Sequence, residues 1–220
     1  PAIESVDLFK RSVGLETDIV NKEMFVVEPR TGSSEQICLK PEATASTMRA
    51  FLENGIQNLP WKVFSFDTLF RYERPQKGRY REFNQCNIEV IGAESINQDV
   101  SLISMLDSLF SVKLKITNYA LVLNFLGCQN DRIKFREILT NFLQASPNIC
   151  ETCQKRSTTN PLRIFDCKND DCQAIYQNAP KIITHLCEVC DQEWQQLQNH
   201  LELLGVSFAI KPELVRGLDY

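Results

Sequence analysis

The chain has 220 residues, 43% of them hydrophobic, which suffices for one substantial core or for a core plus a small appended domain and excludes a disordered or fibrous chain. Its 24 Lys and Arg residues against 28 Asp and Glu residues give a net charge of -4, so any nucleic-acid contact must be local. No stretch approaches the roughly 20 apolar residues of a membrane span. Nine cysteines in a chain too long to need a disulfide framework favour a reducing cytoplasm.

The first half of the chain predicts a helix followed by a hairpin. Residues 41–54 are expected to form a helix with proline in its first turn and Gly55 as its stop signal. Two β-like runs, 62–70 and 82–92, are joined by a polar loop. The loop is too short for a parallel crossover, so the pattern predicts an antiparallel hairpin.

The second half alternates helical and strand-like segments. Asp99 is expected to cap a helix, and residues 121–126 to form a buried strand. Beyond Gly127, helical spacing recurs in two apolar stripes, and residues 206–210 return to a strand. The stripes are Phe135, Ile138, Leu139, Phe142 and Leu143, then Leu186, Val189, Glu193, Leu197, Leu201 and Leu204, with Gly205 as the end of the second helix.

Alternation along 82–92 gives the second hairpin strand two different faces. Asn84, Cys86, Ile88 and Val90 form a mostly apolar face that suits a buried side. The other face carries Phe83, Gln85, Asn87 and Glu89, a pattern that fits the floor of a ligand cleft, although an exposed strand with chance polar residues explains it as well.

The hairpin loop is strongly cationic. Five cations lie within eleven residues, with only Glu73 interspersed: Arg71, Arg74, Lys77, Arg79 and Arg81. Arg can hold a phosphate through two charge-assisted hydrogen bonds, which favours a phosphate site, whereas a charge run alone is more often a solvated turn.

These residues carry a family resemblance. Residues 70–83, FRYERPQKGRYREF, closely resemble motif 2 of class II aminoacyl-tRNA synthetases in its histidyl form. Segments 15–24, 40–45 and 214–220 agree with the same family in the same order, the last with its first histidine-specific signature. Residues 160–163 resemble the insertion domain of the family.

The resemblance implies an activation site for histidine and ATP, with Mg²⁺ bound to the nucleotide. Arg71 would bind the α-phosphate, Glu73 the adenine amino group, and Phe83 would stack on the adenine. The histidine substrate would be surrounded by Glu42, Thr44, Gln85 and Glu89. Arg216 would lie opposite Arg71, close to both the α-phosphate and the histidine. Further cations, Lys77, Arg79 and Arg81, would contact the acceptor stem of tRNA(His).

The resemblance also implies an α+β fold, an antiparallel sheet flanked by helices with an inserted helical subdomain, and a homodimer. We expect a catalytic core at 1–127 with part of motif 1, a helical insertion at 128–206 and a return to the core at 207–220. Motif 3 and the anticodon-binding domain are expected to be absent. Asn84 and the stretch Cys86-Asn87-Ile88 depart from the common family pattern, which affects the fine shape of the histidine pocket.

Six of the nine cysteines lie between Phe135 and Leu204. Cys150 and Cys153 form a two-residue-spaced pair, as do Cys187 and Cys190, with Cys167 and Cys172 between them. Such pairs suit a structural zinc site, but the pairs are far apart and two thiols would be left over, so inert buried cysteines are preferred. The histidines, His185 and His200, lie in no recognisable motif.

Two other function classes remain open. One is a synthetase-like regulatory subunit of histidine biosynthesis, which binds histidine without charging tRNA; the intact arginine loop argues against it. The other is a non-enzymatic nucleic-acid module built on the cysteines, for which the expected basic surface is missing at a net charge of -4.

Overall fold

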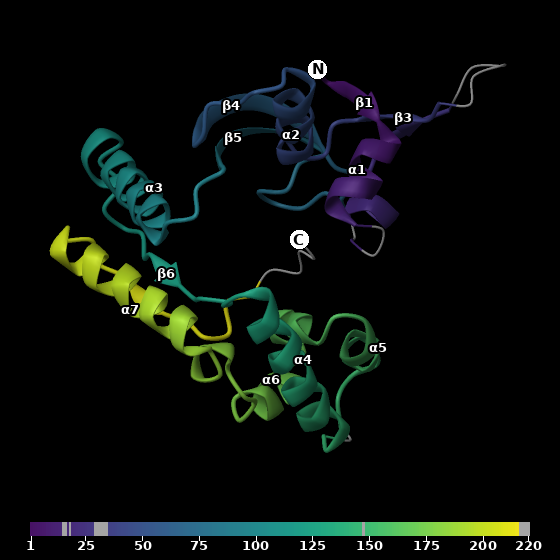
Figure 1. Ribbon diagram of the computed structural model, residues 1–220. Coiled ribbons are helices and arrows are strands. Elements are labelled where there is room, and N and C mark those ends of the chain that lie inside the picture. Colours follow the sequence, from purple (N-terminus) through teal and green to yellow (C-terminus); the bar gives the residue numbers. More distant parts are fainter. Residues whose placement is uncertain (15–16, 18, 29–34, 147, 216–220) are drawn as a thin grey trace. The chain divides into compact units, whose positions relative to one another are not determined.

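The computed structural model describes residues 1–14, 17, 19–28, 35–146 and 148–215 (Figure 1). The chain divides into two compact units at residues 94 and 95, called unit 1 (through Glu94) and unit 2 (from Ser95). Compactness alone does not define an insertion, so the domain boundaries expected at 1–127, 128–206 and 207–220 stay a prediction.

Unit 1 begins with a small antiparallel sheet and a helix. Its strands, β1 (Ile3–Ser5), β2 (Val26–Val27) and β3 (Ile37–Leu39), are ordered β1-β3-β2. Helix α1 (Val6–Val13) follows β1 directly, and a short π-helix, Ile19–Glu23, precedes β2. Apolar side chains at helical spacing on α1, Val6, Phe9 and Val13, form a local core with Cys38 of β3 and with Ala45.

The predicted hairpin is confirmed. Strand β4 (Trp61–Phe70) pairs antiparallel with β5 (Glu82–Ile91) over its whole length. Helix α2 (Thr44–Glu53) precedes the hairpin and ends before Gly55, which adopts a φ of 56°. The helix begins later than expected: Pro41 lies before it, because the Glu42 carboxylate caps the first turn through the N–H groups of Thr44 and Ala45.

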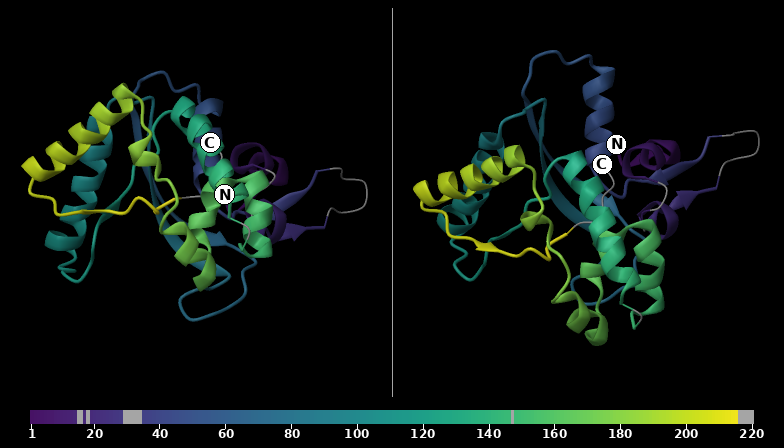
Figure 2. Two further views of the ribbon diagram at one scale, coloured as in Figure 1. Left: turned by 90° about the horizontal axis from the view of Figure 1, so that it is seen from below. Right: turned by 60° about the horizontal axis from the view of Figure 1, so that its bottom comes forward.

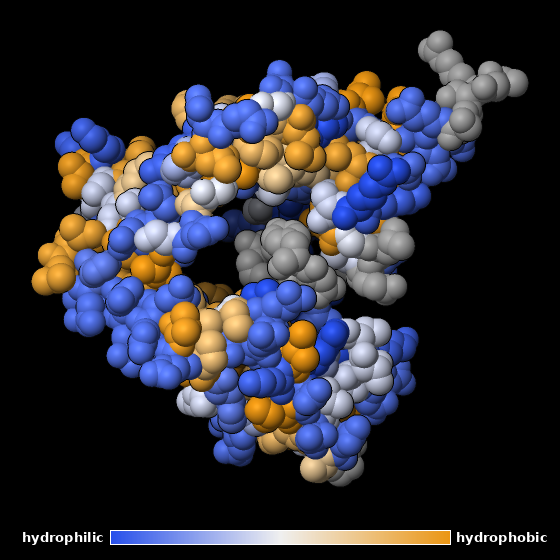
Figure 3. All heavy atoms as spheres, viewed as in Figure 1, coloured by the Kyte–Doolittle hydropathy of each residue, from blue (hydrophilic) through white to orange (hydrophobic). Residues whose placement is uncertain are grey.

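The expectation about which hairpin face is buried was wrong. Phe64 and Phe66 of β4, opposite Ile88 and Cys86, are 75% and 72% exposed. Figure 3 shows apolar surface in the region of β4. The polar face is the better covered one, with Asn87 buried. Alternation identifies two faces but not the one that neighbouring elements cover.

Unit 2 opens with helix α3 (Ile96–Ser108), which continues into a π-helical turn, Leu109–Lys113. Ser95 caps α3 by accepting from the Asn97 N–H, so the expectation that Asp99 is the cap was wrong. Helix α7 (Glu188–Leu203) packs beside α3 in both views of Figure 2. The parallel strands β6 (Val122–Leu123) and β7 (Ala209–Ile210) are shorter than the predicted strands.

The predicted stripe on α7 is confirmed at Leu197 and Leu201 and wrong at Val189 and Leu204. Val189 and Leu204 are exposed, whereas Cys190, Trp194, Leu197 and Leu201 are buried. Cys190 and Trp194 belong to the buried stripe, because cysteine and tryptophan side chains are often buried in protein cores. Gly205 ends the helix as predicted, with a φ of 72°.

The rest of unit 2 is a helical module with its own core. Helix α4 (Gln129–Gln144) is confirmed and buries Phe135, Leu139 and Leu143. It is followed by α5 (Glu151–Thr159), the 3-10 helix Pro161–Asp166, α6 (Asp170–Tyr176) and the 3-10 helix Ile182–Thr184. In the described part of the chain, no helix is long and apolar enough to cross a membrane.

Candidate functional site

The hairpin face predicted as a cleft floor is built from both strands. Phe83, Gln85, Asn87 and Glu89 of β5 stand opposite Leu69, Asp67, Ser65 and Val63 of β4. Residues directly opposite one another in an antiparallel pair share a face, so each polar side chain has a neighbour across the strands. The Gln85 amide donates to the Asn87 side-chain oxygen along this face.

Thr44 links the start of α2 to the hairpin. Its hydroxyl donates a 2.6 Å hydrogen bond to Oε1 of Glu89, and its backbone N–H donates a 2.7 Å bond to Oε2 of Glu42. The three residues are therefore one hydrogen-bonded group, although 45 positions separate Thr44 from Glu89. Burial raises the pKa of the Glu42 carboxyl, the charge of Glu89 adds to the rise, and the N–H groups of Ala45 and Thr44 oppose it.

Arg71, the first residue after β4, is hydrogen-bonded to the backbone next to Glu42. Its Nε donates a 2.9 Å hydrogen bond to the carbonyl oxygen of Pro41, the residue before Glu42. Its guanidinium lies 5.2 Å from the centroid of the Phe83 ring, a cation–π distance. Phe83 and Arg71 are thus connected, through the Pro41 backbone, to the hydrogen-bonded group of Glu42, Thr44 and Glu89.

The loop cations have different partners. Arg79 forms a 3.1 Å ion pair with Glu73, and Arg81 places its guanidinium 4.2 Å from the centroid of the Tyr72 ring. Arg81 also donates from Nε to the Glu73 carbonyl oxygen. Lys77 is exposed at the turn. The cations therefore belong to a partly ordered loop rather than to an unstructured charge run.

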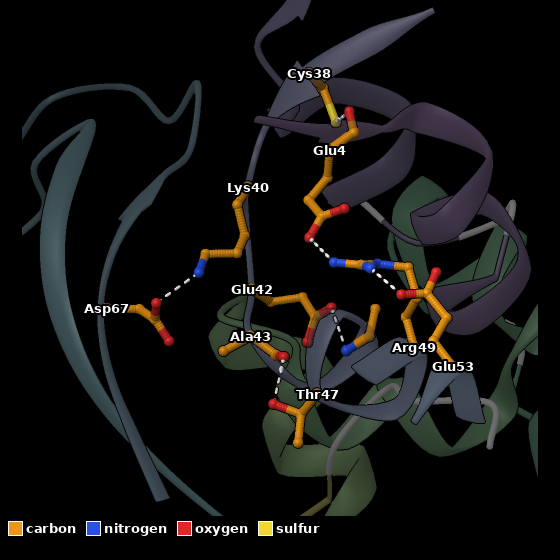
Figure 4. Close-up of polar contacts among 10 residues, drawn as sticks. Glu4, Cys38, Lys40, Glu42, Ala43, Thr47, Arg49, Glu53 and Asp67 are labelled. Atoms are coloured by element: carbon orange, nitrogen blue, oxygen red, sulfur yellow. Dashed lines mark hydrogen bonds and ion pairs between the residues drawn. The ribbon is translucent and has the colours of Figure 1, made fainter. Parts of the chain in front are cut away.

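The sequence reading missed two ion pairs beside this site (Figure 4). Lys40 Nζ lies 2.6 Å from Oδ1 of Asp67, the residue opposite Gln85, and this pair lowers the pKa of Asp67. Arg49 lies 2.9 Å from Glu4, so α2 is tied to β1. Lys40 belongs to a segment that resembles the family, but no local pattern links it to a carboxylate 27 positions away.

Arg216, expected to complete the site, lies outside the described residues. The roles implied for all the site residues stay predictions; the geometry shows where their side chains lie.

The cysteines form two groups, each of which could hold a metal ion. The first, here the four-thiol cluster, consists of Cys150, Cys153, Cys167 and Cys172. The second, here the Asp131 cluster, consists of Cys128, Asp131, Cys187 and Cys190. The two sequence pairs that suggested one zinc site therefore lie in different clusters. Cys167 and Cys172, between the pairs, complete the first cluster, whereas Cys128 and Asp131, ahead of both pairs, complete the second.

Comparisons with known proteins agree with the hairpin motif. The chain is 43% identical over its whole length to the histidine–tRNA ligase of Clostridium perfringens strain SM101, covering 53% of that protein. The apo crystal structure of S. aureus histidyl-tRNA synthetase matches the whole chain with a TM-score of 0.74 and 30% identity, over 49% of that chain. The chain thus spans about half the length of these relatives.

A third match concerns the fold. A Bacillus halodurans structure titled ATP phosphoribosyltransferase regulatory subunit/histidyl-tRNA synthetase matches 98% of the chain and 58% of its own length, with a TM-score of 0.59 and 16% identity. The mixed helix and sheet fold expected from the sequence is confirmed by these structures. The family model described as tRNA synthetase class II core domain (G, H, P, S and T) matches residues 25–202. The chain therefore belongs to the class II tRNA synthetase core domain family, as its hairpin motif indicated.

Proposed function

We propose that this chain supplies the site at which a histidine–tRNA ligase activates L-histidine with ATP before transferring it to tRNA(His). The observation that carries the proposal is the connected series from Phe83 and Arg71 through Glu42 and Thr44 to Glu89. It places a planar ring and a guanidinium at one end and two carboxylates at the other. The 43% identity to a named histidine–tRNA ligase supports the same function.

The nucleotide occupies the hairpin end in this proposal. Phe83 stacks on adenine, and Arg71 binds the α-phosphate next to it. Glu73 accepts from the adenine amino group. Arg79 balances the charge of this carboxylate through their ion pair. When adenine binds, its amino group donates a hydrogen bond to Glu73 and partly replaces the contact with Arg79.

The amino acid occupies the carboxylate end. Glu42 and Glu89 favour its ammonium group and imidazole nitrogens, and Gln85 reads a ring nitrogen. Thr44 fixes the Glu89 carboxylate through the 2.6 Å bond, so the acceptor is oriented before substrate arrives. Bringing a cation between two carboxylates also relieves their mutual repulsion.

The proposed reaction needs no protein nucleophile. A histidine carboxylate oxygen forms a bond to the α-phosphorus of ATP, the bond from that phosphorus to the β-phosphate bridging oxygen breaks, and pyrophosphate leaves. Both reactants are anions, so the chain contributes positioning and positive charge, from Arg71 and in our proposal also from Arg216. Mg²⁺ enters with ATP as part of the substrate and neutralises phosphate charge.

The tRNA contact is proposed at the exposed side of the loop. Lys77, Arg79 and Arg81 carry positive charge in a chain of net charge -4, and their partners in the acceptor stem would be phosphates. These contacts position the tRNA end without reading its sequence.

We also propose that the chain pairs with a second copy and works in the cytoplasm. The resemblance to motif 1 supports a homodimer. Burial of the exposed apolar side chains on the sheet of β1, β2 and β3 against a second copy would stabilise it; these are Ile3, Val26 and Val27. Nine free cysteines suit a reducing compartment. A monomer mass in light scattering would contradict the pairing.

Equilibrium binding separates the proposed synthetase from a histidine-binding regulatory subunit. Calorimetry with L-histidine and with Mg-ATP should show that both bind, and Arg71→Ala should weaken ATP binding while leaving histidine binding nearly unchanged. Gln76, in the same loop, provides the control variant Gln76→Ala. Histidine binding without ATP binding would favour the regulatory subunit, and binding of neither would contradict the proposal.

A further inference from the structure

The four-thiol cluster lies in the helical module of unit 2, and the proposed function makes no use of it. All four Sγ atoms lie within 4.8 Å of one another, and those of Cys150 and Cys167 are 3.8 Å apart. Zinc binds thiolates at about 2.3 Å, so the sulfurs of a tetrahedral site are about 3.8 Å apart. The cluster thus has the size of a tetrathiolate zinc site.

The close approach of four sulfur atoms distinguishes this cluster from ordinary buried cysteines. Cys38 of unit 1 is fully buried and satisfies its thiol with a single contact to the Glu4 carbonyl oxygen. Cys153 and Cys172 are also fully buried, yet their sulfurs lie within 4.8 Å of each other and of the two other thiols. Packing of small apolar side chains does not require four sulfurs to meet at one point.

Polar groups around the cluster are arranged for negatively charged sulfur. The Cys150 N–H donates to Cys172 Sγ at 3.2 Å, and the Asn169 N–H donates to Cys167 Sγ at 3.4 Å. The Tyr176 hydroxyl is buried and has no hydrogen-bond partner in the described part of the chain, while Cys153 and Cys172 are its polar neighbours. A metal-bound thiolate is a stronger acceptor than a thiol and would satisfy this hydroxyl.

The four residues come from three short elements. Cys150 is the N-cap residue of α5 and Cys153 lies in its first turn. Cys167 follows the 3-10 helix Pro161–Asp166, and Cys172 lies in α6, whose cap residue Asn169 accepts from the Cys172 N–H. Helices of nine and seven residues are marginal on their own, so a shared ion would fix them against one another.

The Asp131 cluster differs because hydrogen bonds within the protein already satisfy both oxygens of its carboxylate. Asp131 is 1% exposed and accepts from the Cys187 N–H at 3.1 Å and from the Cys128 N–H at 3.3 Å, one bond to each carboxylate oxygen. Cys190 Sγ accepts from the Cys128 N–H at 3.2 Å. This carboxylate caps the N-termini of α4 and α7 together, which explains its burial without a metal ion.

We propose that the four-thiol cluster binds one structural Zn²⁺ through four thiolates and that this ion holds α5, the following 3-10 helix and α6 together. The ion has no open coordination position, so its role is in folding. The inference does not depend on the proposed function.

Zinc analysis of the purified chain tests the proposal. Protein prepared without chelator should contain about one zinc per chain. Cys153→Ser should lose it, while Cys187→Ser in the Asp131 cluster and the exposed Cys86→Ser should retain it. Because Cys153→Ser can also impair folding, X-ray absorption on the unaltered chain provides a second readout, expected to show four sulfur ligands at about 2.3 Å and no oxygen ligand.

The proposal is overturned by a folded chain that contains no zinc even after exposure to Zn²⁺. It is also overturned by zinc with an oxygen ligand that disappears in Cys187→Ser and persists in Cys153→Ser, since the ion would then belong to the Asp131 cluster. Activity plays no part in either readout, so failure of the proposed function would leave this test unaffected.

Discussion

Thr44 Oγ1 donates a 2.6 Å hydrogen bond to Oε1 of Glu89, joining the first residue of α2 to the hairpin strand β5. The acceptor is a carboxylate, and such charge-assisted bonds contribute more than neutral ones. The bond orients the carboxylate that the proposed function assigns to the histidine substrate.

Thr44→Val should therefore weaken histidine binding and leave ATP binding unchanged. Valine keeps the side-chain shape but removes the hydroxyl, and loss of a hydrogen bond to a charged group costs about 1.5–3 kcal/mol, or roughly 10- to 100-fold in affinity. Calorimetric titration measures both ligands. Thr47→Val is the matched control, since Thr47 donates within the same helix to the Ala43 carbonyl oxygen. Equal losses in the two variants would show that the Thr44 bond has no particular role.

Glu42 should make the stability of unit 1 depend on pH. Its pKa is raised from an ordinary value of 4.5 by burial and then by Glu89, so the folded chain holds the proton to higher pH than the unfolded chain. Its contribution to stability is complete below about pH 4.5 and is lost as pH rises through the folded pKa. Glu42→Gln removes this titration, so the stability of the variant relative to the parent should increase with pH. Denaturant midpoints followed by the fluorescence of Trp61 measure this difference, and parallel curves would contradict it.

Lys77→Gln should reduce the salt dependence of tRNA binding. If Lys77 contacts one phosphate, its loss lowers the slope of log K against log salt by about 0.7–0.9 and leaves ATP binding unaffected. Filter binding over a range of salt concentrations gives the slope. Lys62→Gln is the control, because Lys62 is exposed on the other face of the hairpin from Phe83. An unchanged slope for Lys77→Gln would remove this residue from the tRNA contact.

Asp131→Asn should destabilise unit 2. An amide has only one acceptor oxygen for the two N–H groups that now meet the carboxylate, so one buried donor loses its partner at a cost of about 1–3 kcal/mol. Chemical unfolding followed by the buried Trp194 reports on this unit. Asp191→Asn is the control, with an exposed contact to Gln195 and an expected change within about 0.5 kcal/mol. Similar effects of the two changes would contradict the capping role.

Alanine substitutions at Gly127 and Gly205 distinguish the cost of backbone strain from the cost of a steric clash with a neighbouring side chain. Both adopt positive φ, 65° and 72°, but an added Cβ would lie 2.6 Å from the Asp131 carboxylate at Gly127 and meets nothing within 4 Å at Gly205. Gly205→Ala should cost about 1–2 kcal/mol from backbone strain alone, and Gly127→Ala clearly more. The same Cβ would lie 2.8 Å from the Leu186 side chain. Unfolding of each variant gives the two values, and equal costs would show that both neighbouring side chains move away freely.

The hairpin was predictable because its information is local. Alternation of side chains and the short loop predict β4 and β5, and the motif from Phe70 to Phe83 indicates the family. Contacts between distant segments were not predictable, because they produce no periodic pattern in the sequence. Examples are the bond from Thr44 to Glu89, the ion pair between Lys40 and Asp67 and the division of the cysteines into two clusters. The sequence gives no signal for the second role of Asp131, because a single Asp near a helix start is common and its bond from the Cys187 N–H joins residues 56 positions apart.

ATP–pyrophosphate exchange with each of the twenty amino acids tests the proposed activation of histidine by this chain. We expect exchange with histidine alone, reduced in Arg71→Lys because lysine cannot both bond to the Pro41 carbonyl oxygen and present a planar guanidinium. Exchange driven by another amino acid, or no exchange in a chain that binds both histidine and ATP, would contradict it.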